Sequence, residues 1–264
     1  MKLVRNGKIS YLQPHGLSDG IVAGFSTRNG GVSRAPYNSL NLGLNTEDIQ
    51  ANVDGNRSTF ARSFGLQPHQ LLTVKQVHGK DLLIIDEPNP DLSHFLSLEV
   101  DAIITDQPGF MIGVLVADCF PVLLWDVEKK VMAAVHSGWR GAAEGILQKT
   151  STAMQQQFGC DPANLQAAIG PGIGAHKYEV DRPVRDAFRR GSGFWEQIAT
   201  EVSLGHWQLD IALSCRLQLE QAGLKANHID QTEECTCCHP ELLFSYRRDQ
   251  GKTGRQLGFI MLNE

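Results

Sequence analysis

The stretch Val131–Gly145, VMAAVHSGWRGAAEG, decides how this chain folds. Four of its first five residues are small or β-branched, which is typical of a buried strand, and the run ends in His136. The chain then turns through two glycines, with Arg140 between them, into a segment with helical spacing. A strand that ends in a histidine, followed by an arginine at a helix start, predicts a ligand site. The free N–H groups of a helix N-terminus attract anions.

Apolar runs of strand length surround this stretch. We expect strands over Ile21–Thr27, Leu71–Val77, Asp81–Asp86, Val100–Thr105, Met111–Ala117, Pro121–Trp125, Leu165–Ile169, Phe244–Arg248 and Gln256–Leu262. Apolar residues at helical spacing predict helices over Glu47–Phe64, Gly141–Phe158, Val180–Arg190 and Leu209–Ala222. Because several strands follow one another without a helix between them, the sequence predicts an α/β fold with sheets of mixed strand order.

Length and composition limit the classes of protein that this chain can belong to. The 264 residues are 42% hydrophobic and show no internal repeat or linker, so we expect one domain over residues 1–264. The net charge is −5 with no basic cluster, which argues against nucleic-acid binding. The longest apolar runs are strand-sized, so we expect no membrane segment. The N-terminus lacks signal-peptide patterning, and six cysteines do not form a disulfide framework here. We therefore expect a cytoplasmic protein.

Three side chains that bind metals well stand at the ends of strand-like runs: His78, Cys119 and His136. A short turn at residues 128–130 makes the two strands on either side antiparallel neighbours, so Cys119 and His136 come together at one end of a hairpin. Two imidazoles and a thiolate are a sound ligand set for Zn²⁺ with an open fourth position. Two alternatives stay open from spacing alone. The three residues can be ordinary polar or buried groups, or Cys119 can be a nucleophile with a histidine base and Asp118 as an orienting group.

Two further motifs have more ordinary interpretations. Cys235, Cys237, Cys238 and His239 resemble a metal-binding box, but adjacent cysteines in an extended chain diverge and no second CxxC pair follows. We interpret this segment as structural, or at most accessory. Gly170–Gly174, GPGIG, matches neither a dinucleotide-binding nor a P-loop pattern, and indicates a tight turn.

Arginines beside strand ends indicate an anionic substrate. Arg28 follows a strand, Arg140 stands at a helix start, and Arg247 and Arg248 adjoin Tyr246. Phosphate and carboxylate groups are bound by such side chains. For any one of them alone, a solvated surface arginine is the simpler interpretation.

Seven blocks together resemble the YfiH-type laccase-domain proteins, a family also called polyphenol oxidase, peptidoglycan editing factor or purine nucleoside phosphorylase. The blocks are Phe25–Ser33 (FSTRNGGVS), Tyr37–Asn45 (YNSLNLGLN), Lys75–Asp81 (KQVHGKD), Ala117–Asp126 (ADCFPVLLWD), Ala133–Ile146 (AAVHSGWRGAAEGI), Ala168–Val180 (AIGPGIGAHKYEV) and Phe244–Leu262 (FSYRRDQGKTGRQLGFIML). The resemblance runs from about Ile21 to the C-terminus. Each block alone is weak, whereas seven in order are specific.

The resemblance implies a layered αββα sandwich and a Zn²⁺ bound by His78, Cys119 and His136. It also implies phosphorolysis of adenosine, inosine and 5′-methylthioadenosine, with deamination of adenosine. Purine nucleosides and inorganic phosphate are then the small-molecule partners. For the phosphate we expect Arg140, with Arg28 or Arg57 as alternates. For the departing purine we expect hydrogen bonds from Asn41, Asn45 or Lys75.

Three rival functions stay open from the sequence. A multicopper oxidase needs many histidines, usually in HxH pairs. This chain has nine histidines and no such pair, so copper-dependent oxidation is the weaker hypothesis. Hydrolysis of wrongly built UDP-muramoyl-L-serine-type precursors would use the same zinc site or Cys119. A non-enzymatic binding module is the third class, and an open three-ligand zinc site argues against it.

Overall fold

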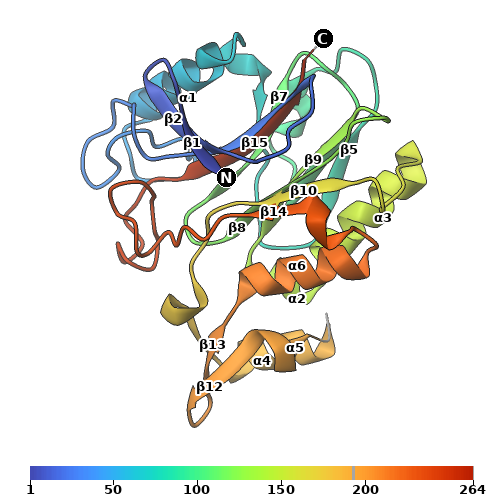
Figure 1. Ribbon diagram of the computed structural model, residues 1–264. Coiled ribbons are helices and arrows are strands. Elements are labelled where there is room, and N and C mark those ends of the chain that lie inside the picture. The colour runs from blue at the N-terminus through green and yellow to red at the C-terminus, as the bar shows by residue number, and fades with distance from the viewer. Residues whose placement is uncertain (192–193, 264) are drawn as a thin grey trace.

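The computed structural model describes residues 1–191 and 194–263 (Figure 1). The expected domain, residues 1–264, includes residues 192–193 and 264, which lie outside the described residues. Within the described part, no helix has the length and apolar character needed to cross a membrane.

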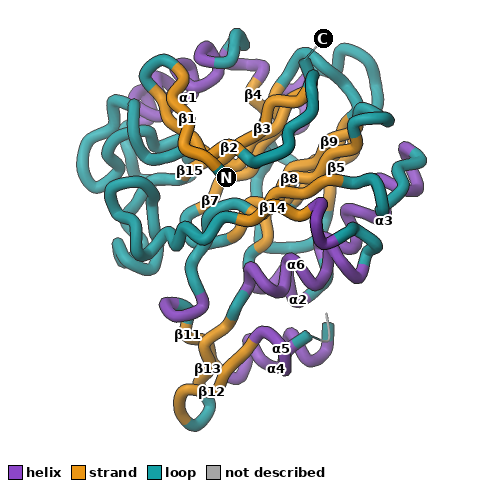
Figure 2. The backbone as a smooth tube through the Cα atoms, viewed as in Figure 1, coloured by secondary structure: helices purple, strands orange, loops and turns teal. Residues whose placement is uncertain are grey.

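Two mixed sheets form the centre of the molecule (Figure 2). The first sheet has the order β1 (Lys2–Asn6), β2 (Ile9–Gln13), β3 (Ile21–Ser26), β15 (Gln256–Leu262), β7 (Met111–Val116) and β4 (Leu71–Leu72). The second sheet has the order β14 (Ile229–Gln231), β10 (Gln166–Ile169), β8 (Phe120–Asp126), β9 (Val131–Ser137), β6 (Ala102–Thr105) and β5 (Leu82–Ile85). A small third sheet has the order β11 (Glu179–Asp181), β13 (His206–Leu209) and β12 (Ala199–Ser203).

Helices cover the outer faces of both large sheets (Figure 1). The helix α1 (Gln50–Ser63) packs on the first sheet, where Phe60 meets Phe259 with ring centroids 5.1 Å apart. The second sheet is covered by α2 (Trp139–Ala143), α3 (Ile146–Phe158) and α6 (Ile211–Gln221), and α4 (Arg182–Arg190) and α5 (Trp195–Ile198) lie beside the third sheet. Buried side chains such as Phe25 and Trp125 fill the space between the two large sheets. The αββα order implied by the family resemblance is confirmed.

The strands β8 and β9 are buried on both faces because they lie in the middle of this stack. In β8, Val122 and Leu124 contact the helix layer, whereas Leu123 and Trp125 contact the first sheet. This two-residue alternation follows from strand geometry. The two strands pair antiparallel, with Pro121 opposite His136, so the hairpin inferred from the sequence is confirmed.

One expected strand is shorter than expected and another does not form. In each case the side-chain amide of a glutamine makes the hydrogen bonds that a neighbouring strand would make. Only Leu71–Leu72 of the expected strand Leu71–Val77 pairs with β7. Beyond it, the Gln76 amide donates to the Leu115 carbonyl oxygen and accepts from its N–H. Phe244–Arg248 forms no strand: the Gln256 amide bonds both backbone groups of Phe244, and the chain turns from Ser245 onward.

Two groups of strands were not expected from the sequence. The strands β1 and β2 form an antiparallel hairpin at the edge of the first sheet, and the third sheet consists of strands of three to five residues. Exposed residues dominate β1 and β12, so their apolar patterning is weak. Short edge strands form through pairing with a neighbour that local sequence does not reveal.

Candidate active site

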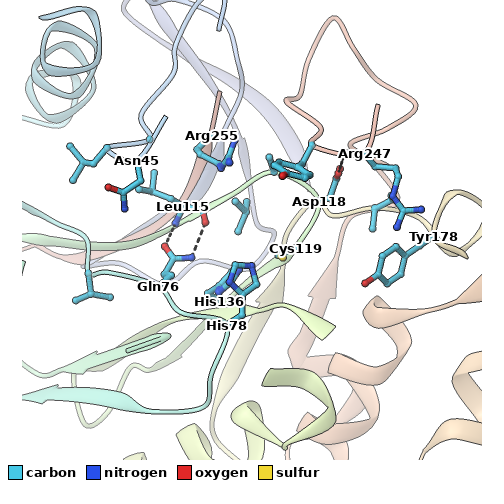
Figure 3. Close-up of a pocket in the computed structure, with 17 residues that line it drawn as sticks. Asn45, Gln76, His78, Leu115, Asp118, Cys119, His136, Tyr178, Arg247 and Arg255 are labelled. Carbon is cyan, nitrogen blue, oxygen red and sulfur yellow. Dashed lines mark hydrogen bonds between the residues drawn. The ribbon is translucent and has the colours of Figure 1, made fainter. Parts of the chain in front are cut away.

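Three side chains from two parts of the chain converge at one end of the β8–β9 hairpin (Figure 3). Cys119 immediately precedes β8, His136 lies near the end of β9, and His78 follows the segment that Gln76 ties to β7. Their ligand atoms lie within 4.8 Å of one another. The rings of His78 and His136 are nearly perpendicular, with centroids 4.7 Å apart. The trio named from the sequence is therefore brought together by the fold.

A buried carboxylate, Asp101, holds both histidine segments in place. Its oxygens accept hydrogen bonds from the backbone N–H groups of Val77, His78 and Gly79 at 3.2, 3.0 and 2.7 Å. One of them also lies 2.7 Å from Nδ1 of His136. When Nδ1 donates to this carboxylate, Nε2 is left free to bind a metal, which is the usual arrangement for a metal-binding histidine. Asp101 also stabilises His78 in its left-handed backbone conformation, with φ of 61°.

Gly138 leaves room for the three side chains to meet. A Cβ atom at this position would lie 3.1 Å from Cδ2 of His78, 3.2 Å from Sγ of Cys119 and 3.7 Å from Cε1 of His136. The φ of Gly138 is −79°, so its backbone does not require glycine. The close approach of the three side chains is what excludes a larger residue.

Proton equilibria within the cluster favour a thiolate. Burial acts to raise the pKa of Cys119, but the charge of His136 and hydrogen bonds from both imidazoles outweigh it and lower that pKa to about 6. Burial acts to lower the pKa of His136, and the charge and hydrogen bonds of Cys119 and Asp101 raise it to about 9. A thiolate beside two imidazoles is a suitable ligand set for a borderline-soft divalent metal.

The same geometry also fits the hypothesis that Cys119 is a nucleophile, but with a different orienting residue. Asp118 does not face His136: its carboxylate accepts hydrogen bonds from the Thr236 hydroxyl and from the Arg247 N–H. Asp101 is the carboxylate that orients the imidazole. A thiolate, an imidazole and a buried carboxylate are the components of a nucleophilic cysteine site as well as of a metal site.

The cluster opens into a pocket of about 520 Å³, a volume in the range of small-molecule sites. Leu115, Val116 and Ile173 contribute apolar walls, and Figure 3 shows polar side chains around the opening. The polar and aromatic lining residues are Asn45, Gln76, Asp118, Tyr178, Tyr246, Arg247 and Arg255.

Two arginines give the pocket its positive charge. Arg247 lies over the ring of Tyr178 at 5.2 Å from the ring centroid, and the guanidinium of Arg255 lies 5.6 Å from the centre of the Tyr246 ring. Arg255 is half-buried, and it donates to the carbonyl oxygens of Thr253 and Gly254. Both arginines come from the C-terminal segment Phe244–Leu262, in which the sequence indicated Arg247 but not Arg255 as an anion-binding residue.

Among the polar residues named from the sequence for the substrate, Asn45 lines the pocket. Asn41 does not: it is fully buried, and its amide bonds Thr46, Asp48 and the backbone of Gly43 and Arg255. Arg57 is also buried, and donates to carbonyl oxygens of Leu42 and Leu71 and to the Thr73 hydroxyl. The structure thus gives Asn41 and Arg57 contacts that hold the first sheet and its loops together.

The other named cations lie outside the pocket lining. Arg28 donates to the carbonyl oxygens of Asn38 and Pro240 and covers the ring of Phe244. Lys75 is exposed and pairs with Glu99 at 2.7 Å. Arg140 is exposed on α2 and stacks on its neighbour Trp139, 4.5 Å from the ring centroid.

Four residues of the site were not expected from the sequence: Asp101, Gln76, Tyr178 and Arg255. Asp101 did carry a signal, since a carboxylate directly before the apolar run of β6 is a costly residue to bury without partners. Arg255 and Tyr178 carried no local signal, because only the packing of the C-terminal segment against the loop after β10 brings them to the pocket.

Comparison with known proteins gives a consistent result over most of the chain. Residues 22–263 match the family model described as multi-copper polyphenol oxidoreductase laccase. The purine nucleoside phosphorylase YlmD of Bacillus subtilis is 32% identical over 248 residues, which are 92% of this chain and 89% of the relative. The purine nucleoside phosphorylase YfiH of Escherichia coli is 37% identical over 245 residues, 92% of this chain and 94% of the relative.

Solved structures agree with the fold. The crystal structure of Bacillus licheniformis hypothetical protein YfiH superposes with a TM-score of 0.87 at 32% identity, covering 92% of this chain and 93% of that chain. The matched span of the family model includes His78, Cys119 and His136 and the segments that line the pocket.

Proposed function

Because the chain belongs to the multi-copper polyphenol oxidoreductase laccase family, with relatives named purine nucleoside phosphorylase, we propose that it is a zinc-dependent purine nucleoside phosphorylase. Its proposed substrates are adenosine, inosine and 5′-methylthioadenosine with inorganic phosphate, and it also deaminates adenosine. We assign this activity to the cytoplasm, because six cysteines in a chain of 264 residues do not have the spacing of a disulfide framework.

One observation carries the proposal: the His78, Cys119 and His136 cluster forms the floor of a pocket that also holds two arginines. Phosphorolysis needs a cavity large enough for a nucleoside and positive charge for a phosphate. A volume of about 520 Å³, tyrosine rings and the guanidinium groups of Arg247 and Arg255 supply both.

The donor set fits zinc on the chemistry of its atoms. His78 and His136 offer imidazole nitrogens, Cys119 offers a thiolate, and Asp101 orients the imidazole of His136. Three protein ligands leave one position free, as in catalytic rather than structural zinc sites. When bound there, zinc supplies Lewis acidity that polarises an oxygen atom or lowers the pKa of a water molecule.

In phosphorolysis, a phosphate oxygen forms a bond to C1′ of the ribose while the C1′–N9 bond breaks, and the purine leaves with that electron pair. We assign binding of the phosphate to Arg247 and Arg255, because both line the pocket and the Arg140, Arg28 and Arg57 side chains do not. The assignment replaces Arg140 as the first choice made from the sequence.

The departing purine needs a hydrogen-bond or proton donor. Burial, and then the nearby Cys119 charge, raise the pKa of Tyr178, so its hydroxyl stays protonated and can donate. Asn45 offers an amide N–H at the pocket rim. We assign these two side chains to the purine, with Lys75 and Asn41 held by other contacts. Deamination replaces the 6-amino group of adenosine with oxygen from water and releases ammonia.

A nucleoside assay with and without phosphate tests the proposal. Purine and ribose 1-phosphate should appear only with phosphate present, whereas adenosine deamination should not need it. Arg247→Ala should raise the phosphate KM about 10–100-fold at unchanged zinc content, since a hydrogen bond to a charged group contributes about 1.5–3 kcal/mol.

Arg140→Ala is the matched control, and should leave the phosphate KM near that of the wild type. The reverse outcome, with Arg140 and not Arg247 controlling phosphate, would contradict the assignment. Cys119→Ser should lose both zinc and activity. Cleavage of a muramoyl-serine amide without phosphate, and no purine release, would instead support the editing function.

A further inference from the structure

A second cluster of metal-binding side chains lies at the junction of two loops outside the pocket lining. Cys235 is buried and pairs with Gly172 in an isolated parallel bridge. The Gly174 N–H donates to Sγ of Cys235 at 3.1 Å, and the Thr236 N–H donates to the Gly172 carbonyl oxygen at 2.9 Å. The loop after β10 is therefore joined to the cysteine-rich segment by several backbone contacts.

A turn brings a second cysteine back to the first. The N–H groups of Cys238 and His239 both donate to the Cys235 carbonyl oxygen, at 3.1 and 3.2 Å. In an extended chain, neighbouring cysteines diverge and cannot share a metal ion. The turn removes that objection for Cys235 and Cys238.

The third side chain comes from an element distant in sequence. His176 lies in the 3-10 helix η3 (Ala175–Lys177), and its Nε2 is 3.2 Å from Sγ of Cys238. The ligand atoms of His176, Cys235 and Cys238 all lie within 4.8 Å of one another. In a tetrahedral site with zinc–sulfur and zinc–nitrogen bonds of about 2.3 and 2.0 Å, ligand atoms stand roughly 3.5–3.8 Å apart. The separations in the structure, 3.2 Å between His176 Nε2 and Cys238 Sγ and at most 4.8 Å for the other pairs, bracket that range.

We propose that His176, Cys235 and Cys238 form a second Zn²⁺ site, separate from the pocket cluster. Two thiolates and one imidazole favour zinc over hard cations such as Mg²⁺ and Ca²⁺. The Gly174 N–H, which already donates to Cys235 Sγ, stabilises the negative sulfur of a bound thiolate. His176 and Cys238 are exposed, so a water molecule completes the tetrahedron from solvent.

The site lies outside the pocket lining, so its open position faces solvent and not a bound substrate, and we assign it a positioning role. His176 is two residues before Tyr178, and the cysteine segment leads to Arg247, whose guanidinium lies over the Tyr178 ring. Thr236 also donates to Asp118, the carboxylate that accepts from the Arg247 N–H. A metal at this junction fixes the relative positions of the two loops that bring Tyr178 and Arg247 to the pocket.

Metal stoichiometry of the full chain, purified under reducing and anaerobic conditions and saturated with Zn²⁺ before desalting, tests the proposal. The wild type should hold two zinc ions per chain. His176→Ala and Cys238→Ser should each hold one fewer and keep the wild-type circular dichroism, because both side chains are exposed. Cys237→Ser is the matched control in the same segment and should keep both ions.

Cobalt spectra separate this site from the proposed catalytic one. In the Cys119→Ser chain, which lacks the pocket thiol, Co²⁺ should still give a thiolate charge-transfer band, and the further change Cys238→Ser should abolish it. This readout does not depend on phosphorolysis. Absence of the band in Cys119→Ser, equal zinc in wild type and Cys238→Ser, or a Cys235–Cys238 disulfide that forms equally with and without Zn²⁺ would overturn the proposal.

Discussion

Replacement of Asp101 by Asn tests how the two histidine segments are held together. The carboxylate accepts four hydrogen bonds, three from backbone N–H groups and one from Nδ1 of His136. An amide of the same shape offers one acceptor oxygen and an NH₂ group that cannot accept. Whichever way the amide turns, it places a donor against at least one buried donor.

The size of the effect follows from these contacts. A buried donor left without a partner costs about 1–3 kcal/mol of stability. The loss of a group that orients a metal ligand typically weakens metal binding about 10–100-fold. The zinc affinity of Asp101→Asn should therefore fall by that factor, equivalent to about 1.4–2.7 kcal/mol.

A competition titration against a chromophoric zinc chelator measures this affinity, and chemical denaturation of the metal-free chain measures the stability. Asp81→Asn is the matched control, because it removes the same charge from an exposed side chain that pairs with Lys149 at 2.9 Å. Wild-type zinc affinity in Asp101→Asn would refute the reasoning, as would an equal loss in Asp81→Asn.

Three other predictions test the packing and the charges of the site. Gly138→Ala should weaken zinc binding at least several-fold with little change in unfolding free energy, because the added methyl group presses on His78 and Cys119. Gly55→Ala is the control: its Cβ would meet only a Val32 methyl group at 3.7 Å, so the zinc affinity should not change. Phe259→Ala should lower the free energy of unfolding by about 3–5 kcal/mol in a denaturant titration, since it empties the aromatic cluster under α1; a change below 1 kcal/mol would contradict that packing. In the metal-free chain, the charge of His136 lowers the pKa of Cys119 to about 6, so its thiolate forms at a pH well below the ordinary range of a thiol. Alkylation of Cys119 by iodoacetamide should accordingly decrease about tenfold per pH unit below that point, and a midpoint near 9 would be inconsistent with the charge of His136.

The sequence was sufficient for most strands and helices of the fold and for naming His78, Cys119 and His136 as candidate metal ligands. Alternating apolar residues in β8 and β9 and the short turn between them are local features, and they place Cys119 and His136 at the same end of a hairpin. The family resemblance supplied the αββα order and linked His78 to the other two residues, and the family membership is now confirmed.

Arginine roles could not be predicted in the same way. Arg140 stands where an anion-binding residue is expected, yet its side chain turns to Trp139, and Arg57 is engaged by buried carbonyl oxygens. A guanidinium binds whichever acceptors the packed chain places around it. The residues next to an arginine in the sequence do not determine which acceptors those are.

Local patterns therefore determined the strands, the hairpin and the residue types capable of binding a metal. Tertiary structure alone decided which distant groups act together: Asp101 with His136, 35 positions apart, and His176 with Cys238, 62 positions apart. The physical reason is that periodicity and turn residues act over a few positions. Contacts across tens of residues form only when the sheets and loops pack, because that packing supplies the free energy that closes the long loops between them.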